Sequence, residues 1–312
     1  MYLCLDGGNA ARQRKKQKNT THINIKRIKK MKTTGYFNGE IGELSEMKIP
    51  LCDRSVFYGD AIYDAVLVLK GIPFALELHL DRLYNSCKLA EIAFTMPREE
   101  LKGEIEKLLG YCDSDAAMLY IQVTRGAAPR KHEYPENASP NLIMFISAQK
   151  LAPKDKKASL MSIEDLRFQY CNIKTVNLLP NVFAAQKATA NGYTEALLNR
   201  KGRVTEAAHS SILMLKDGSL VVPPLDELIL PSITRAIIIK LCEENSIPVI
   251  AREFTTDELK AADEIILCST TKSILYVFNI DGEEVGGKDR ALAERLQNLI
   301  FDKIYEETGV RL

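Results

Sequence analysis

The sequence predicts a two-domain protein of the α/β and α+β classes, with a smaller N-terminal α/β domain and a larger, β-rich C-terminal domain. Its 312 residues exceed the roughly 100–200 residues of a usual single domain. The N-terminal half combines strand-like runs with helical spacing of apolar residues, whereas the C-terminal half contains successive hairpin signals. A polar stretch broken by proline at residues 151–157 has the composition of an exposed linker. We therefore expect domains at residues 34–150 and 158–312.

Residues 1–33 are expected to form a basic, disordered leader. Residues 1–30 contain nine Lys/Arg against the single acid Asp6, a net charge of +8 in a chain whose total is +1. Such a run could bind nucleic acid or guide import into an organelle, but it lacks the apolar core of a secretory signal. Ordered patterning begins only near Tyr36, and Met31 could start a chain of sensible length. We therefore expect the leader to be disordered or absent from the mature protein.

The composition is that of an ordinary globular protein, with 46% hydrophobic and 27% charged residues. No segment approaches the roughly 18 consecutive apolar residues that span a bilayer. The seven cysteines stand singly, and none of the four histidines has the i, i+4 spacing of metal ligands on a helix. We therefore expect a cytoplasmic protein with reduced thiols and no structural metal, and neither a membrane nor a nucleic-acid partner.

The N-terminal domain is predicted to begin with a tight hairpin, because Asn38-Gly39 lies between strand-like residues. Strands and helices follow, distinguished by their period-2 or helical spacing of apolar residues. In chain order these are a strand at residues 61–69, a helix with its apolar face at Leu80, Leu83, Cys87 and Ala90, a helix after Pro97, and strands at residues 118–124 and 142–146.

The C-terminal domain is predicted to be rich in antiparallel β structure, because short strand-like runs are separated by turn signals such as Lys201-Gly202 and Asp217-Gly218. Thr255 and Glu258 have the spacing of a capping box that would start a helix. The expected strands lie at residues 195–199, 204–207, 212–215, 220–222 and 264–267, and the other expected helices lie at residues 182–190 and 233–244.

Two candidate catalytic groups, Lys174 and Glu206, stand among small or apolar residues. An apolar setting penalises the charged form of a lysine and makes its neutral amine available for Schiff-base chemistry, although most lysines are simply exposed. A carboxylate in the position of Glu206 could keep the nitrogen of a bound pyridine ring protonated. A glutamate on an edge strand is the alternative, and each residue alone leaves both interpretations open.

Three segments could bind a phosphate group. Ile233 and Thr234 open a helix, whose free N–H groups favour an anion, and Ser269 and Thr270 supply hydroxyls directly after a strand. Arg82 could add a forked cation from the polar side of its helix. An ordinary helix cap and a surface ion pair are the alternatives.

A basic loop follows the strand that ends near residue 124. The segment VTRGAAPRKH at residues 123–132 places several cations within a few residues, among them Arg130 and His132. An arginine in such a loop could bind a substrate carboxylate through two parallel hydrogen bonds. A basic surface loop is the alternative.

From Tyr36 to the C-terminus, the chain resembles the class IV (fold-type IV) pyridoxal-phosphate-dependent aminotransferases. The similarity rests on NIKTVNLL at residues 172–179, on VTE ending at Glu206, 32 residues after Lys174, and on HLDRL at residues 79–83. It implies that the C-terminal domain is a pseudo-barrel and that pyridoxal 5′-phosphate forms a Schiff base with Lys174. The residues expected to bind the cofactor are Arg82, Lys174, Glu206, Ile233, Thr234, Ser269 and Thr270.

Within the family, the chain is most similar to the D-amino acid transaminases, because of QVTRG at residues 122–126 and PRKH at residues 129–132. This similarity implies that Arg130 and His132, with Tyr63, bind the substrate carboxylate. It also implies a homodimer whose substrates are D-amino acids and 2-oxo acids, of the D-alanine/2-oxoglutarate type. A branched-chain L-amino acid aminotransferase and an aminodeoxychorismate lyase share the cofactor residues and are alternatives, and a non-enzymatic binding protein with a degenerate site is a remote one.

The segment after Glu206 departs from the family pattern. The family usually has glycine or serine there and an asparagine a few residues later, whereas this chain has AAHSS at residues 207–211. The departure leaves the cofactor residues in place, but the resemblance then implies no preferred substrate side chain. His209 could line the side-chain region of the substrate or could be a surface residue.

Overall fold

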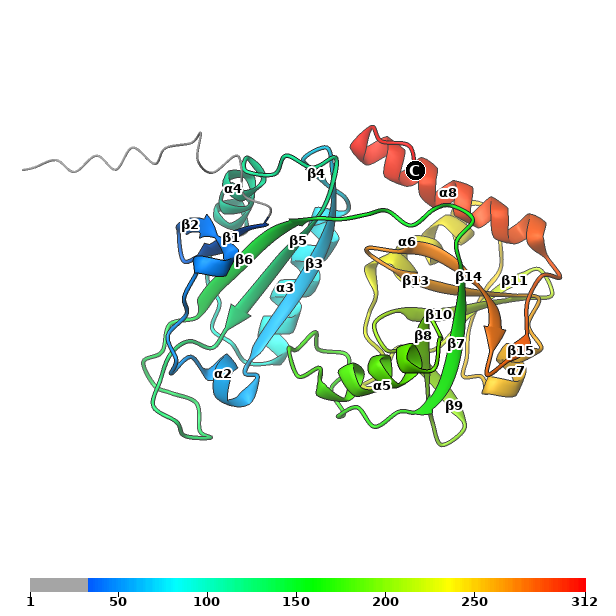
Figure 1. Cartoon of the computed structure of the whole chain (residues 1–312), viewed down its shortest axis with the longest axis horizontal. Coiled ribbons are helices and arrows are strands. Elements are labelled where there is room, and N and C mark those ends of the chain that lie inside the picture. The colour runs from blue at the N-terminus through cyan, green and yellow to red at the C-terminus, as the bar shows by residue number, and fades with distance from the viewer. Residues whose placement is uncertain (1–32) are drawn as a thin grey trace, which may run out of the picture.

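A computed structural model describes residues 33–312, which form two β-sheets, each with its own helices (Figure 1). The predicted leader, apart from Thr33, lies outside the described residues, and Thr33 is the first residue of strand β1. The predicted two-domain fold class, with a β-rich C-terminal half, is confirmed. Within residues 33–312, no helix is both long and apolar enough to cross a membrane.

The small sheet contains six strands in the order β2-β1-β6-β5-β3-β4, and every neighbouring pair is antiparallel. The predicted hairpin is present, since Phe37 pairs with Glu40 and the two turn residues, Asn38 and Gly39, have φ values of 45° and 96°. The elements of this half are β1 (Thr33–Phe37), β2 (Glu40–Glu43), the 3₁₀ turn η1 (Leu44–Glu46), α2 (Arg54–Tyr58), β3 (Ala61–Leu69), β4 (Ile72–Pro73), α3 (Leu76–Leu89), α4 (Arg98–Leu109), β5 (Ala116–Thr124) and β6 (Asn141–Ala148).

The large sheet has the order β12-β11-β10-β13-β14-β7-β8-β9, with β15 paired to β14. The segment predicted as the linker lies between β6 and β7, except that its last residue, Lys157, begins β7. The elements of this half are β7 (Lys157–Glu164), α5 (Leu179–Ala190), β8 (Glu195–Arg200), β9 (Arg203–Ala207), β10 (Ser211–Lys216), β11 (Ser219–Val222), α6 (Ile233–Glu244), β12 (Val249–Ala251), α7 (Thr256–Lys260), β13 (Glu264–Ser269), β14 (Ser273–Ile280), β15 (Glu283–Glu284) and α8 (Arg290–Thr308).

The large sheet is mixed rather than purely antiparallel. The predicted hairpins β8–β9 and β10–β11 are present, but β7 pairs in parallel with both β8 and β14, and β11 pairs in parallel with β12. The β7–β8 pair needs a crossover because parallel neighbours cannot be joined by a tight turn, and α5 lies in that connection. Helix α8 was not predicted from the sequence, although it is the longest helix of the described residues.

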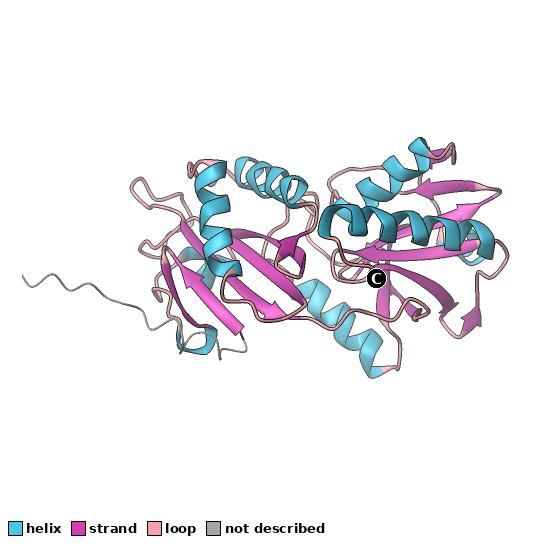
Figure 2. Cartoon of the chain, turned by 90° about the horizontal axis from the view of Figure 1, so that it is seen from above, coloured by secondary structure: helices cyan, strands magenta, loops and turns pink. Residues whose placement is uncertain are grey.

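The two sheets are held together by shared apolar packing. One cluster of buried side chains joins Leu67, Leu69 and Phe74 of the small domain to apolar residues of α6 and α8. In a separate cluster α3 and α4 cover one face of the small sheet, whereas α6 and α8 pack on the large sheet within the first cluster (Figure 2). Burying each large aliphatic side chain contributes about 1.5–3 kcal/mol, so this cluster fixes the edge of one sheet relative to the other.

Candidate active site

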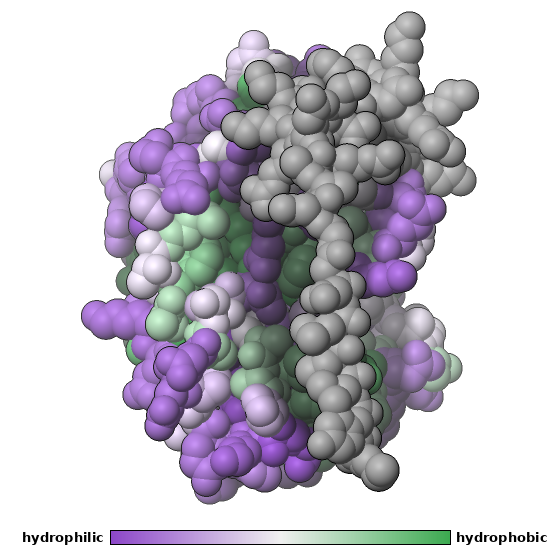
Figure 3. Space-filling view, turned by 90° about the vertical axis from the view of Figure 1, so that its left-hand side faces the viewer, coloured by the Kyte–Doolittle hydropathy of each residue, from purple (hydrophilic) through white to green (hydrophobic). Residues whose placement is uncertain are grey.

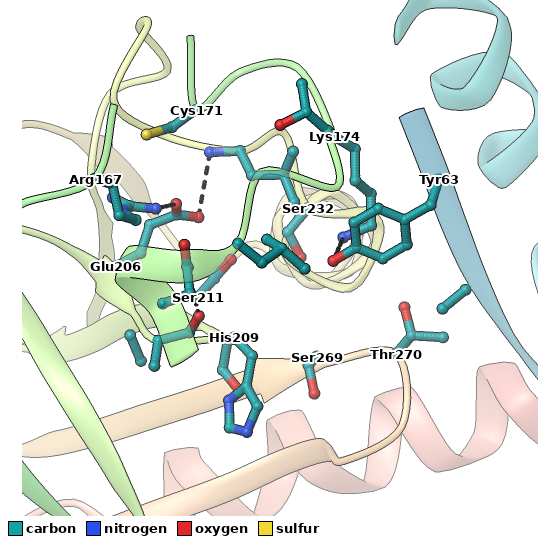
Figure 4. Close-up of a pocket in the computed structure, with 18 of the residues that line it drawn as sticks. Tyr63, Arg167, Cys171, Lys174, Glu206, His209, Ser211, Ser232, Ser269 and Thr270 are labelled. Atoms are coloured by element: carbon teal, nitrogen blue, oxygen red, sulfur yellow. Dashed lines mark hydrogen bonds and ion pairs between the residues drawn. The ribbon is translucent and has the colours of Figure 1, made fainter. Parts of the chain in front are cut away.

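A cavity of about 450 Å³ is lined by side chains from both domains. Tyr63 and Arg82 come from the small domain, whereas Lys174, Glu206 and the β13–β14 turn belong to the large one. Lys174 and Tyr63 lie on one side, and Glu206 and Arg167 lie on the other (Figure 4). This size is typical of pockets that bind small molecules or cofactors.

Lys174 lies in a loop that is bound along strand β3. Its carbonyl oxygen accepts a hydrogen bond from the Tyr63 N–H at 2.9 Å, and Thr175 forms an isolated bridge with Ile62. These backbone contacts fix the loop against the small domain. The Lys174 Nζ is 3.5 Å from the Tyr63 Oη and 4.5 Å from the centre of the Tyr63 ring, so the amine faces an aromatic donor and acceptor across the domain junction.

Glu206 is a buried carboxylate on β9, with 6% of its surface exposed. One oxygen accepts a hydrogen bond from the Arg167 guanidinium at 2.5 Å, and the other accepts one from the Leu230 N–H at 3.2 Å. Burial raises the pKa of Glu206 above its ordinary value, and the guanidinium of Arg167 opposes that rise. The side chain is therefore held in one orientation. Of the two opposing effects on its proton affinity, burial is the larger.

Arg167 and Asp165 were not identified from the sequence. Asp165 accepts hydrogen bonds from Arg167 on both of its oxygens, at 2.9 and 2.8 Å, and Arg167 also donates to the Leu228 carbonyl at 3.0 Å. Asp165 thus anchors the cation that holds Glu206. The two residues lie in the loop after β7, where the local sequence carries no motif that distinguishes them from a surface ion pair.

Replacing Asp165 with asparagine is expected to reduce the loss of stability in acid. Burial alone would raise the pKa of Asp165, but Arg167 and the Thr205 hydroxyl lower it from 3.8 to about 2. A carboxyl group whose pKa is lower in the folded chain than in the unfolded chain stabilises the fold when the pH is above its unfolded-state pKa. This stabilisation is lost as the pH falls through the folded-state pKa. Between pH 6 and pH 2.5 the unsubstituted chain should lose about 1.5 kcal/mol more than Asp165→Asn, as measured by urea unfolding. Equal losses in the two proteins would contradict this expectation.

Arg82 is fixed by a second buried carboxylate, Asp64, which the sequence analysis did not select. Arg82 donates to both Asp64 oxygens, at 2.8 and 2.7 Å, and His79 Nδ1 lies 2.7 Å from the same carboxylate. Asp64 is fully buried, and although burial would raise its pKa, Arg82 and His79 hold that pKa well below its ordinary value. A charged residue within the otherwise apolar strand β3 was the signal that could have identified it.

The predicted phosphate-binding residues lie around two cavities that share Thr270. Arg82 donates at 3.1 Å to the carbonyl of Pro231, just before α6, where Ser232 caps the helix by accepting the Arg235 N–H at 3.2 Å. Ser269 and Thr270 line the main cavity. The side chains of Ile233 and Thr234 do not, but both line a small adjoining cavity together with Thr270 and His79.

Arg130 and His132 do not line the cavity of their own chain; both are exposed in the loop after β5. That loop is nevertheless well anchored. The buried Arg54 donates to the carbonyls of Lys131, His132 and Glu133 at 2.6, 3.2 and 3.2 Å, and its Nε donates to Asp60 at 2.7 Å. The structure therefore presents these two side chains on a fixed loop at the surface, and it brings only Tyr63 of the predicted carboxylate-binding residues into the cavity.

The chain is similar to known proteins over most of its length. A family model described as "Amino-transferase class IV" matches residues 61–280. The D-alanine aminotransferase of Bacillus licheniformis is 35% identical over 276 residues, which cover 88% of this chain and 98% of that protein. The Escherichia coli branched-chain amino acid aminotransferase has a similar structure, with a TM-score of 0.79, 23% identity and coverage of 88% and 94%. Another branched-chain amino acid aminotransferase, complexed with N-(5′-phosphopyridoxyl)-L-glutamate, gives a TM-score of 0.78, 23% identity and coverage of 89% and 95%.

Proposed function

Because this chain belongs to the class IV aminotransferase family, we propose that it uses pyridoxal phosphate to transfer amino groups between D-amino acids and 2-oxo acids. The observation that carries the proposal is that a lysine amine, Lys174, and a buried carboxylate, Glu206, line opposite sides of one cavity. The assignment to D-amino acids is supported by the D-alanine aminotransferases among its relatives.

The residues around the cavity fit this cofactor. Among residues 33–312, the only polar contact of the Lys174 amine is the long one of 3.5 Å to the Tyr63 hydroxyl, which leaves the amine available to bond an aldehyde carbon. Glu206 offers a carboxylate for a ring nitrogen, and Arg82 with the start of α6 and the β13–β14 turn offers cationic and N–H donors for a phosphate. When bound, pyridoxal phosphate supplies an electron sink for the electrons released at the substrate Cα.

The roles of the protein residues follow from their positions. Lys174 would hold the cofactor covalently and, once released by the incoming substrate amine, would move the proton at the substrate Cα as a general base. Glu206 would keep the ring nitrogen protonated, and Arg167 would fix the orientation of Glu206 through its 2.5 Å hydrogen bond. Tyr63, whose hydroxyl is 3.5 Å from the lysine amine, would contact both that amine and the substrate carboxylate.

A second copy of the chain would complete the carboxylate-binding site. Arg130 and His132 lie outside the cavity of their own chain, yet their loop is fixed by Arg54. Large apolar side chains near the cavity are exposed, and a hollow with hydrophobic surface is visible on the side of the molecule that the small domain forms (Figure 3). The exposed side chains beside or within the cavity wall are Leu166, Phe168, Tyr170, Leu178, Leu179, Val182 and Phe183. We propose a homodimer that covers this apolar surface and brings Arg130 and His132 of one protomer to the cavity of the other.

Mixing two inactive variants tests this arrangement. Lys174→Ala lacks the amine, and Arg130→Ala lacks the substrate cation, so each homodimer should be nearly inactive. If the loop acts on the partner's cavity, a mixed dimer has one intact site, made from Lys174 of one protomer and Arg130 of the other. Half of the dimers in an equal mixture refolded together are mixed, so about a quarter of all sites should be active. Recovery should be absent when the two variants are mixed without exchange of protomers. No recovery after proven exchange would place Arg130 in its own protomer's site, and a fully active Arg130→Ala homodimer would place it outside any site.

A substrate panel tests the proposed reaction itself. The purified protein with pyridoxal phosphate should form pyruvate from D-alanine and 2-oxoglutarate with ping-pong kinetics, because the amino group passes through the enzyme between two half-reactions. L-leucine with 2-oxoglutarate should give at least about a hundredfold lower kcat/KM than D-alanine with 2-oxoglutarate. A loss of about this size is expected when the substrate carboxylate no longer reaches the cations that bind it. A preference for L-leucine would reject the D-amino acid assignment and leave the family assignment intact.

A further inference from the structure

A polar cluster of Glu195, His209, Ser210 and Lys272 forms a part of the cavity wall to which the proposed function assigns no role. His209, Ser210 and Lys272 line the cavity, and Glu195 lies behind them with 1% of its surface exposed. Figure 4 shows His209 beside Ser269, on the side of the cavity away from Lys174. His209 lies in the segment, residues 207–211, that departs from the family pattern.

Glu195 organises the cluster by accepting hydrogen bonds on both oxygens. One oxygen accepts the His209 N–H at 2.7 Å and pairs with His209 Nδ1, and the other accepts the Ser210 hydroxyl at 3.0 Å and the Lys272 ammonium at 2.5 Å. Burial alone would raise the pKa of Glu195, but His209 and Lys272 hold it below its ordinary value. The carboxylate is therefore ionised and saturated with donors, and it fixes the position of both basic side chains.

The cluster leaves donors available to a ligand. A carboxylate can only accept, so His209 Nδ1 carries a proton that it donates to Glu195, and Nε2 faces away from Glu195. Nε2 can donate to a ligand carboxylate only when the ring carries a proton on both nitrogens. The Lys272 ammonium carries three protons, of which one is directed to Glu195 and another to the Ser210 hydroxyl at 3.4 Å. The side chains of Lys272 and His209 are 23% and 58% exposed, so both are reachable from the cavity.

This wall is separate from the proposed phosphate end. Thr270 and Lys272 lie in the same β13–β14 turn but face different groups. Thr270 also lines the small cavity beside His79 and Thr234, next to the N-terminus of α6, whereas Lys272 bonds to Glu195 at the start of β8. A phosphate bound near α6 would therefore leave Lys272 and His209 to a different anionic group.

We propose that Lys272 and His209 bind the side-chain carboxylate of dicarboxylic substrates, such as 2-oxoglutarate and D-glutamate. This inference rests on the proposed function, which places the substrate Cα near Lys174 and its first carboxylate against Tyr63, Arg130 and His132. A dicarboxylate then has a second anionic group that needs a cation elsewhere on the wall. Lys272 supplies that cation, and the protonated ring of His209 would supply a second donor, Nε2, in an orientation that Glu195 fixes.

The test compares dicarboxylic with monocarboxylic acceptors. With D-alanine replaced by D-2-aminobutyrate as donor, the ratio of kcat/KM for 2-oxoglutarate to that for pyruvate should fall about 10- to 100-fold in Lys272→Met, which is the effect of losing one charged hydrogen bond. His209→Gln, which can still donate to Glu195, should lower the ratio by a smaller factor, and Lys272→Arg should retain most of it. Lys240→Met removes a lysine that is 75% exposed on the outside of α6, and it should leave the ratio unchanged.

Binding of a non-reacting dicarboxylate separates this inference from the proposed function. Glutarate should bind the unsubstituted protein at least about tenfold more tightly than butyrate by calorimetry, and Lys272→Met should abolish that difference. If no D-amino acid is transaminated but the glutarate preference is present and depends on Lys272, the proposed function fails and the anion site stands. An unchanged acceptor ratio in both Lys272→Met and His209→Gln would overturn the inference. Weaker retention of pyridoxal phosphate by Lys272→Met, with an unchanged ratio, would also overturn it by placing Lys272 at the phosphate.

Discussion

Lys174→Ala is expected to lower kcat for D-alanine transamination about 10³- to 10⁴-fold. The variant loses both the amine that would hold the cofactor and the base that would move the proton at the substrate Cα, and a positioned base alone contributes about 10²–10⁴. The loop itself should keep its shape, because its contacts with β3 are made by backbone groups of Tyr63, Lys174 and Val176. Steady-state kinetics of the purified protein, supplied with excess pyridoxal phosphate, measure the effect.

Lys187→Ala is the matched control, since this lysine is exposed on α5 and touches none of the cavity. Its kcat should stay within about twofold of the unsubstituted protein. Reduction of the loaded protein with borohydride, followed by peptide mapping, should also locate the cofactor on residue 174. Activity of Lys174→Ala comparable to that of Lys187→Ala, or cofactor mapped to another lysine, would contradict the assignment.

Glu206→Gln is expected to lower kcat about 10²- to 10³-fold while the protein remains folded. Glutamine keeps the size of the side chain and can still accept a hydrogen bond, but it carries no negative charge to keep a ring nitrogen protonated. Losses of this size follow when a fixed electrostatic contact to a reacting group is removed. Arg167 would retain its paired hydrogen bonds to Asp165, so the substitution does not leave a buried cation without a partner.

Glu227→Gln provides the control for this substitution, because Glu227 is exposed and does not line the cavity. Thermal unfolding of both variants should show that Glu206→Gln is folded under the assay conditions. Glu206→Asp should keep part of the activity, because it restores the charge at a greater distance from the ring. Full activity in Glu206→Gln would show that this carboxylate does not contact the cofactor.

The sequence predicted those elements of the fold whose signals are local. Strand β3 and helix α6 have the predicted bounds, since β3 is a continuous strand-like run and Ser232 caps α6. The capping box of Thr255 and Glu258 is also confirmed. The parallel pairs were not predicted, because β7, β12 and β14 were themselves not identified as strands. In addition, β7 and β14 are over a hundred residues apart, and no short segment specifies which strands become neighbours. Helix α8 was not predicted, although Asp289 caps its first turn, because a single capping residue without a capping box or motif is a weak signal for a helix.

In the candidate site, too, the residues with local sequence signals were predicted and those that depend on distant contacts were not. Lys174, Glu206 and Arg82 were selected from short motifs, and they line one cavity. Arg167 and Asp64 were not selected, because their importance arises from contacts with residues far along the chain, namely Glu206 and Arg82. Arg130 and His132 belong to a recognisable segment, yet they lie outside the cavity of their own chain, and no local sequence signal indicates on which side of the fold their loop is anchored.

The central claim is that the protein transaminates D-amino acids on a cofactor held between Lys174 and Glu206. It is tested most directly by the visible absorbance of the protein loaded with pyridoxal phosphate. D-alanine and L-leucine are added separately, without a 2-oxo acid, so that only the first half-reaction can proceed. D-alanine should change the spectrum to that of the aminated cofactor within one turnover and release one pyruvate per site, whereas L-leucine should leave it unchanged. A protein that retains no absorbing cofactor, or that responds to L-leucine and not to D-alanine, would contradict the claim.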